Sequence, residues 1–161
     1  MAKHSQWHKI IITTAVLLLF AFAGTARAAN GGGLTLYDVA KLQSVGDVSI
    51  APDGSDIAYT LRVQRNPFTG ENGDAYYELH LVDTEGNSRG YVTGDVDVSE
   101  IDWVPDGSGV SFRAKREGDE HTALYVIPRN GGEARKVYEH KSSIREYAWN
   151  PDGTKVAFLA K

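Results

Sequence analysis

The sequence predicts an all-β fold made of repeated antiparallel units, and three observations support this prediction. The phrase Pro-Asp-Gly occurs three times, starting at Pro52, Pro105 and Pro151. Each copy has large apolar residues alternating with small or polar ones on both sides, which is the pattern of half-buried strands. The copies begin 53 and 46 positions apart, and a repeat of this length built from short strands is typical of β-propeller blades.

Each Pro-Asp-Gly phrase is expected to form a tight turn between two strands. Proline presets φ at the first corner, aspartate suits the next position, and glycine accepts a positive φ without steric cost. The residue before proline is pushed towards an extended conformation, so the incoming strand ends there. The sequence therefore predicts three hairpins joined by the same turn.

The similarity between the first two copies extends beyond these hairpins. Glu78–Val82 aligns without gaps on Ala123–Ile127, and Gly86 then falls on Gly131. Four strands per repeat follow, as a propeller blade requires. The predicted fold is an incomplete β-propeller of two four-stranded blades plus half of a third, at about 47–93, 100–138 and 144–161. The predicted strands are 47–51, 56–63, 76–83, 89–93, 100–104, 109–115, 122–128, 134–138, 144–149 and 155–160.

Large aromatic residues occur in phase before two of the turns. Trp103 and Trp149 occupy the same position of the repeat, and Tyr147 lies two residues before Trp149. This regular placement predicts packing between the strands of the blades. The alternative interpretation of these aromatic residues is a platform on which a ligand stacks.

The first two blades differ mainly in the connection between their second and third strands. This connection contains the polar segment Gln64–Asp74 in the first blade and only Lys115–His121 in the second. In a blade it lies on the same side as the connections from one blade to the next. The segment Gln64–Asp74 is therefore predicted to be the most variable element near any opening on that side.

The first residues are predicted to serve export. A basic start is followed by the apolar run Ile10–Ala23, 14 residues long, and by the small-x-small pattern Ala26-Arg27-Ala28. This order is typical of a secretory signal peptide at residues 1–28, cleaved near Ala28, with an uncleaved anchor as the alternative. Residues 29–46 are predicted to be a lead-in with a short helix at Thr35–Leu42. The expected location is the periplasm.

Composition limits the partners of the exported chain. Removal of residues 1–28 takes away three of the 17 basic residues and none of the 21 acidic ones, which leaves a formal charge of −7. This charge argues against nucleic acid or an anionic membrane as a partner. The chain has no cysteine, so no disulfide supports it outside the cell. Since a ring needs about 4–8 blades, we expect the chain to be the opening of a longer protein.

No catalytic, cofactor-binding or metal-binding residue is predicted in this chain. The Gly-x-Ser-x-Gly elbow of a nucleophilic serine does not occur in the sequence. His80, His121 and His140 have no metal-ligand spacing to one another. The segment Asp95–Ser99 is superficially similar to a calcium loop, but Glu100 stands where such a loop needs glycine.

The residues before the first turn resemble a known family. Leu34–Val45 directly precede Gly46–Tyr59, and together they are similar to the N-terminus of exported bacterial prolyl oligopeptidase-family serine peptidases, of the dipeptidyl or acylaminoacyl peptidase type. Those proteins open with a short helix followed by valine, Ser-Pro-Asp-Gly and Ile-Ala-Tyr. This chain has Ala51 where serine is usual, and the resemblance covers residues 34–161.

The resemblance implies a propeller that restricts access to short peptides, followed by an α/β-hydrolase domain with catalytic Ser, Asp and His. It assigns none of those residues to this chain, so peptide substrates are expected to react only in the hydrolase domain. The alternative is a periplasmic Tol-type propeller that binds a partner without catalysis, and a structural or surface-layer propeller is a third hypothesis. The sequence leaves substrate specificity, the number of blades and the oligomeric state open.

Overall fold

A computed structural model describes residues 33–161 of the chain. Residues Leu34–Lys161 form one compact unit. The predicted signal peptide and its cleavage near Ala28 lie outside the described residues.

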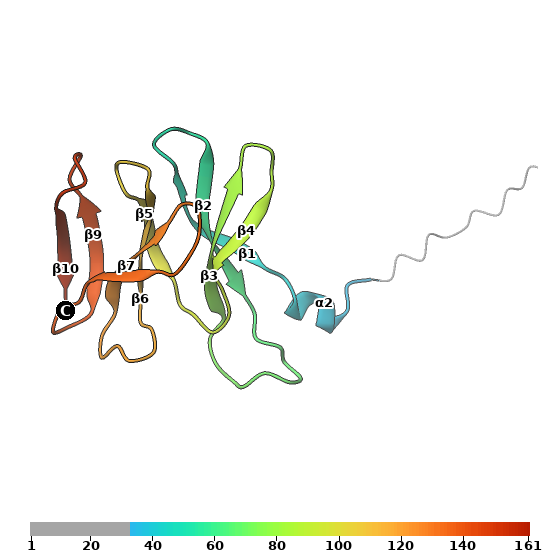
Figure 1. Ribbon diagram of the computed structural model, residues 1–161. Helices are drawn as coiled ribbons and strands as arrows, with labels where there is room; N and C mark the ends of the chain where they lie inside the picture. The colour runs from blue at the N-terminus through green and yellow to red at the C-terminus, as the bar shows by residue number, and fades with distance from the viewer. Residues whose placement is uncertain (1–32) are drawn as a thin grey trace, which may run out of the picture. The chain divides into compact units, whose positions relative to one another are not determined.

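The described part consists of one short helix, two four-stranded sheets and a hairpin (Figure 1). Each sheet is an antiparallel meander in which consecutive strands pair, so each has the strand order of a propeller blade. We call β1–β4 blade 1, β5–β8 blade 2 and β9–β10 the half-blade. The elements are α2 (Leu36–Ala40), β1 (Ser44–Ile50), β2 (Asp56–Val63), β3 (Tyr76–Asp83), β4 (Ser88–Val92), β5 (Ser99–Trp103), β6 (Gly109–Ala114), β7 (Ala123–Pro128), β8 (Arg135–Tyr138), β9 (Ile144–Trp149) and β10 (Val156–Ala160).

All ten predicted strands are present, and most of their ends agree with the prediction to within one residue. The largest difference is at β1, which begins at Ser44 instead of residue 47. The pairing of β1 with β2 shifts register between Val45 and Val48, so an irregularity interrupts the strand without ending it. The alternating pattern around Gly46 was too short to indicate these extra residues.

The three Pro-Asp-Gly phrases form the predicted turns. The amide of the glycine donates to the carbonyl oxygen of the residue before proline, over 2.8 Å at Gly54 and Gly107 and 3.0 Å at Gly153. The three glycines have φ values of 72°, 70° and 70°, which explains why the phrase ends in glycine. In each turn the aspartate also accepts a hydrogen bond from the amide two residues later. The three copies of Pro-Asp-Gly therefore form the same turn with the same hydrogen bonds.

The predicted helix is confirmed, but its apolar side is exposed. Thr35 caps the helix, and its hydroxyl and the Asp38 carboxylate exchange hydrogen bonds with each other's backbone amides. Leu36 is 90% exposed and Val39 49% exposed. The i, i+3 pattern correctly indicated a helix, whereas the burial expected for such a pattern is absent.

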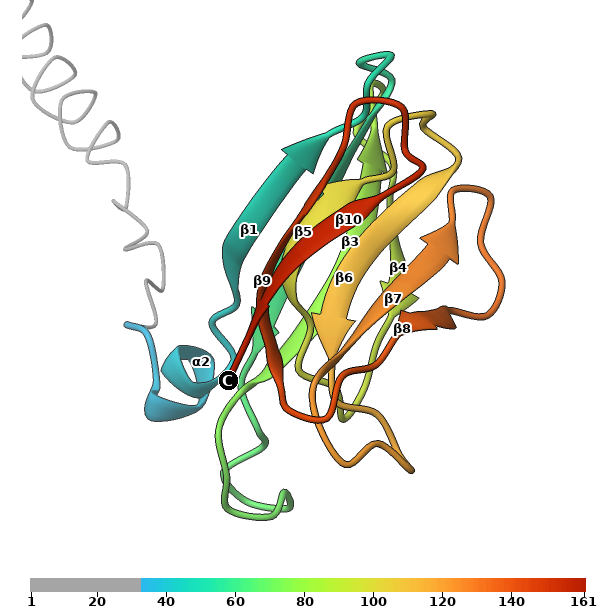
Figure 2. The same cartoon turned by 90° about the vertical axis from the view of Figure 1, so that its left-hand side faces the viewer.

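The sheets stack so that blade 2 is covered on both sides. Figure 2 shows the half-blade in front of blade 2, and Figure 1 shows blade 1 on the opposite side. In blade 2, successive residues of β6 and β7 are buried irrespective of the face to which they point. Blade 1 shows the alternating burial of a sheet covered on one face only, with Ala58 and Thr60 buried between more exposed neighbours. The core thus lies between the sheets.

Both tryptophans donate a hydrogen bond to the preceding blade, although to different kinds of acceptor. The indole Nε1 of Trp103 donates to the backbone oxygen of Ser49 in blade 1 over 3.0 Å. The indole Nε1 of Trp149 donates to the Ser111 hydroxyl in blade 2 over 2.9 Å. Trp103 is only 3% exposed. The prediction of packing is confirmed for both tryptophans, which are engaged between blades.

One residue of β5 has an unusual backbone conformation. Glu100 has a φ of 50°, which is uncommon for a residue with a side chain. Its amide donates to the Asp47 carboxylate of blade 1, and its carbonyl oxygen accepts from the Tyr147 hydroxyl of the half-blade. Hydrogen bonds from blade 1 and from the half-blade therefore hold the backbone of Glu100 in place.

Candidate functional site

A charged groove is lined in part by residues of the β2–β3 connection. This connection lies on the lower side of the sheets in Figure 1. The volume of the groove is about 440 Å³. It extends from the end of β2 and the start of β3 to the connection between blade 1 and blade 2, and it reaches Lys115 after β6. Polar atoms dominate its walls, which include Arg62, Arg65, Lys115, Asp74, Asp95 and Asp97.

Arg65 is the most tightly held cation of the groove. Its Nε donates to the Asp74 carbonyl oxygen over 2.7 Å, and its guanidinium lies 4.2 Å from the centre of the Tyr76 ring. Asp95 lies 3.7 Å away across the groove. A Cβ atom on Gly73 would meet Arg65 Nε at 2.8 Å, so a larger residue there would displace the Arg65 side chain. Arg65 is thus fixed as a wall of the groove, beside the less constrained Arg62 and Lys115.

The long β2–β3 connection contacts the helix before the first blade. The rings of Tyr37 in α2 and Phe68 in the loop have centroids 5.7 Å apart, and Lys41 lies 3.9 Å from the Tyr37 ring. Within the loop, the Asn66 side chain accepts a hydrogen bond from the Phe68 amide. The segment Gln64–Asp74 is therefore braced by the helix at the border of the groove.

The histidines within residues 33–161 do not come together. His80 lies in β3, where its ring is 3.0 Å from Glu78 and stacks with Tyr59 at a centroid distance of 5.5 Å. His140 contacts Ser142 and Phe158 in the half-blade region. Within residues 33–161, no three His, Cys, Asp or Glu side chains are grouped as metal ligands. The helix α2, with five residues, is far too short to span a membrane, and no other helix in this range could do so.

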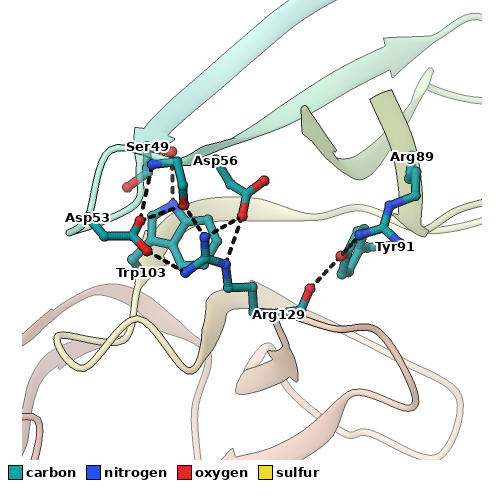
Figure 3. A network of polar contacts seen from close by, with 8 residues as sticks. Ser49, Asp53, Asp56, Arg89, Tyr91, Trp103 and Arg129 are labelled. Atoms are coloured by element: carbon teal, nitrogen blue, oxygen red, sulfur yellow. Dashed lines mark hydrogen bonds and ion pairs between the residues drawn. The ribbon is translucent and has the colours of Figure 1, made fainter. Parts of the chain in front are cut away.

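Arg129 links blade 2 to the first Pro-Asp-Gly turn (Figure 3). Its guanidinium binds Asp53 over 2.8 Å and Asp56 over 2.7 Å, and it also donates to the Ser55 hydroxyl. Its backbone oxygen accepts a hydrogen bond from Tyr91 of β4. Asp53, Asp56 and Tyr91 belong to or border blade 1, so one residue of blade 2 fastens two places of its neighbour.

The Arg129 contacts shift the pKa values of Asp53 and of Arg129 itself. Hydrogen bonds from Ser55, and then from Arg129, hold the pKa of the Asp53 carboxyl well below its usual value of 3.8. The pKa of Arg129 is correspondingly raised by its hydrogen bonds with Asp53 and Asp56. Because Asp53 has a lower pKa in the folded chain, its contribution to stability is present above pH 3.8 and is lost as the pH falls towards the folded value.

Replacing Arg129 with glutamine is expected to lower the midpoint of urea unfolding at pH 7. The loss relative to the parent chain should shrink as the pH falls below 3.8, because the unfolded chain then takes up a proton at Asp53 and the contribution of this carboxylate to the stability of the parent declines. Urea titrations followed by circular dichroism at several pH values measure both effects. The matched control is glutamine in place of the exposed Arg145 in β9. A pH-independent loss would show that Arg129 acts by packing alone.

Neither the groove nor the Arg129 contacts were predicted from the sequence. Their members lie far apart in the chain and come together through blade stacking. One signal existed for Arg129, which falls at the repeat position that Thr84 occupies in blade 1. An arginine at a turn where the other repeat has threonine indicates a contact specific to one pair of blades.

The chain is similar to known proteins in sequence and in fold. It is 32% identical over 125 residues to an uncharacterized peptidase, YuxL, of Bacillus subtilis, and the match covers 76% of this chain and 18% of that protein. This chain therefore spans about a fifth of the length of the curated relative that it matches. No family model matches the sequence.

Two solved structures have the same architecture. One is a putative TolB from Agrobacterium tumefaciens, with a TM-score of 0.58, 18% identity, and coverage of 73% of this chain and 39% of that chain. The other is TolB from Acinetobacter baumannii, with a TM-score of 0.52, 18% identity, and coverage of 72% and 26%. At this identity the likeness concerns the fold alone. Residues 34–161 are therefore an incomplete β-propeller, with similarity in sequence to a peptidase.

Proposed function

We propose that residues 34–161 are part of the propeller domain of an exported serine peptidase, and that this propeller limits which peptides reach a separate catalytic domain. The observation that carries the proposal is the 32% identity with the Bacillus subtilis peptidase over 125 residues. The resemblance of Leu34–Tyr59 to the opening of prolyl oligopeptidase-family enzymes supports it. Export to the periplasm rests on the N-terminal sequence pattern.

The charged groove supports a role in handling peptides. A short peptide carries an ammonium group at one end and a carboxylate at the other. The groove offers Arg62 and Lys115 to a carboxylate and Asp95 and Asp97 to an ammonium group. The loop Gln64–Asp74 borders this groove, so its length affects how long a ligand the groove admits.

Shortening the loop Gln64–Asp74 in the complete peptidase to the length of Lys115–His121 is expected to change substrate length preference. Longer peptides should gain kcat/KM relative to the shortest ones by roughly tenfold, since a few steric contacts supply discrimination of this size. A panel of peptides of increasing length measures the effect. The control keeps the loop length and replaces Glu71 and Asn72 with serine. An equal loss for all lengths would show that the loop is only structural.

The Tol-type binding protein remains the alternative at the level of the fold. The two TolB structures share 18% identity with this chain, and a likeness of that size does not carry a binding partner over. The peptidase similarity is stronger and extends over more of the sequence.

A further inference from the structure

Two cations of the charged groove have no acidic partner. Arg62 comes from β2 of blade 1, Lys115 follows β6 of blade 2, and both line the groove. The ion pairs formed within residues 33–161 include neither of them. With the Gln64 amide in the orientation that satisfies its hydrogen bonds, its oxygen accepts from the Arg62 guanidinium over 3.2 Å. Gln64 is uncharged, so the charge of Arg62 is not neutralised.

Arg65, the third cation of the groove, is already engaged. Its guanidinium donates to the Asp74 carbonyl oxygen and the Tyr76 hydroxyl, and it forms an ion pair with Asp95 over 3.7 Å. Only 23% of its side chain is exposed. An anionic ligand that enters the groove therefore finds its free positive charges at the other two cations.

The strand pairing keeps Arg62 apart from Asp97. Arg62 pairs with Tyr77 of β3, and Tyr77 pairs with Asp97 in a parallel bridge. Residues paired across neighbouring strands point to the same face, and two strand spacings put the Cα atoms of Arg62 and Asp97 about 10 Å apart. Tyr77 thus stands between the two charges. The groove has a cationic border at Arg62 and Lys115 that Asp97 does not neutralise.

We propose that Arg62 and Lys115 bind the C-terminal carboxylate of a short peptide, so that the complete peptidase selects short substrates with a free C-terminus. This inference rests on the proposed function. A guanidinium matches both oxygens of a carboxylate, and an ammonium group adds a second positive charge. Every peptide with a free C-terminus carries this anion whatever its sequence, so the site recognises where a peptide ends rather than which side chains it has.

The test uses the complete peptidase and a panel of internally quenched peptides of increasing length, each made as a C-terminal acid and as a C-terminal amide. The ratio of kcat/KM for acid and amide is measured at each length. Arg62→Gln and Lys115→Gln each remove one cation, and Arg62→Lys keeps the charge without the planar fork. Arg145→Gln removes an exposed cation outside the groove and is the matched control. Circular dichroism verifies that each variant folds.

The acid is expected to exceed the amide by roughly tenfold at the length that places the C-terminus in the groove, since hydrogen bonds to a charged group supply discrimination of this size. Arg62→Gln and Lys115→Gln should each lower this ratio towards one, and Arg62→Lys should lower it less than Arg62→Gln. Arg145→Gln should leave it unchanged.

Two results would overturn this inference while the proposed function stands. One is an equal kcat/KM for acid and amide at every length in the parent enzyme. The other is an acid preference that survives in the double variant Arg62→Gln, Lys115→Gln. Failure of the complete protein to hydrolyse any peptide of the panel would instead overturn the proposed function, and this inference with it.

Discussion

Replacing Trp103 with alanine is expected to lower the free energy of unfolding of the chain by about 3–5 kcal/mol. The side chain is 3% exposed and lies between blades 1 and 2. Its removal leaves a cavity between the sheets and also removes the hydrogen bond to the Ser49 backbone oxygen. Urea unfolding followed by circular dichroism gives the change.

Two further variants separate the causes of this loss. Trp103→Phe keeps one aromatic ring and should cost about 1 kcal/mol for the lost hydrogen bond, plus a packing loss smaller than that of Trp103→Ala. Trp149→Ala should cost less than Trp103→Ala, because Trp149 is only partly buried. A loss below about 1 kcal/mol for Trp103→Ala would contradict the assignment of this residue to the packing between blades.

Replacing Ser111 with alanine is expected to cost about 1–3 kcal/mol. Its hydroxyl is fully buried, donates to the Asp102 carbonyl oxygen over 2.9 Å and accepts from the Trp149 indole over 2.9 Å. It also lies 2.9 Å from the Tyr147 hydroxyl. Without it, the indole N–H loses its acceptor between blade 2 and the half-blade. Equilibrium unfolding in urea measures the cost.

A double-mutant cycle with Trp149→Phe tests this cause directly. In the phenylalanine background the indole donor is already absent, so Ser111→Ala should cost about 1 kcal/mol less than in the parent chain. Additive losses would mean that the Ser111 hydroxyl acts only through Asp102 and Tyr147.

The strands and turns were predictable because they depend on local chemistry. Proline, aspartate and glycine specify the same turn in each copy, and alternating residues specify the strands on both sides. The repeat also predicted correctly that Trp103 and Trp149 pack in the blades, but not that they bond to the preceding blade. The exposure of Ile50 at the same repeat position was not predictable, because the pattern cannot show whether a neighbouring blade covers a given face.

The charged groove could not be predicted from the sequence, because its residues lie far apart in the chain. Arg65 and Asp95 are 30 positions apart, and Lys115 comes from another blade. Their proximity depends on how the β4–β5 connection crosses between blades, where the Tyr77 amide donates to the Val96 carbonyl oxygen and the Val98 amide to the Tyr77 carbonyl oxygen. The loop prediction supplied one border of the groove, since Gln64–Asp74 lies where the repeat had indicated an extra segment.

The sequence pattern predicted the helix Leu36–Ala40 but not which of its residues are buried. In the structure Thr35 and Asp38 cap this helix as a capping box with a short acidic residue. The spacing of its apolar residues indicated a helix, but it did not indicate which part of the chain packs against that helix. Its contact with the chain runs through Tyr37 and Phe68, outside the stripe that the period indicated.

Labelling of the native protein by a serine-directed probe tests most directly whether this propeller serves a peptidase. An antibody against residues 34–161 isolates every polypeptide that carries them from cells that make the protein, after exposure of those cells to a fluorophosphonate. The account predicts a labelled polypeptide heavier than the 17.6 kDa of this chain, with the label outside residues 34–161. Recovery of these residues only in polypeptides that the probe leaves unlabelled would contradict it.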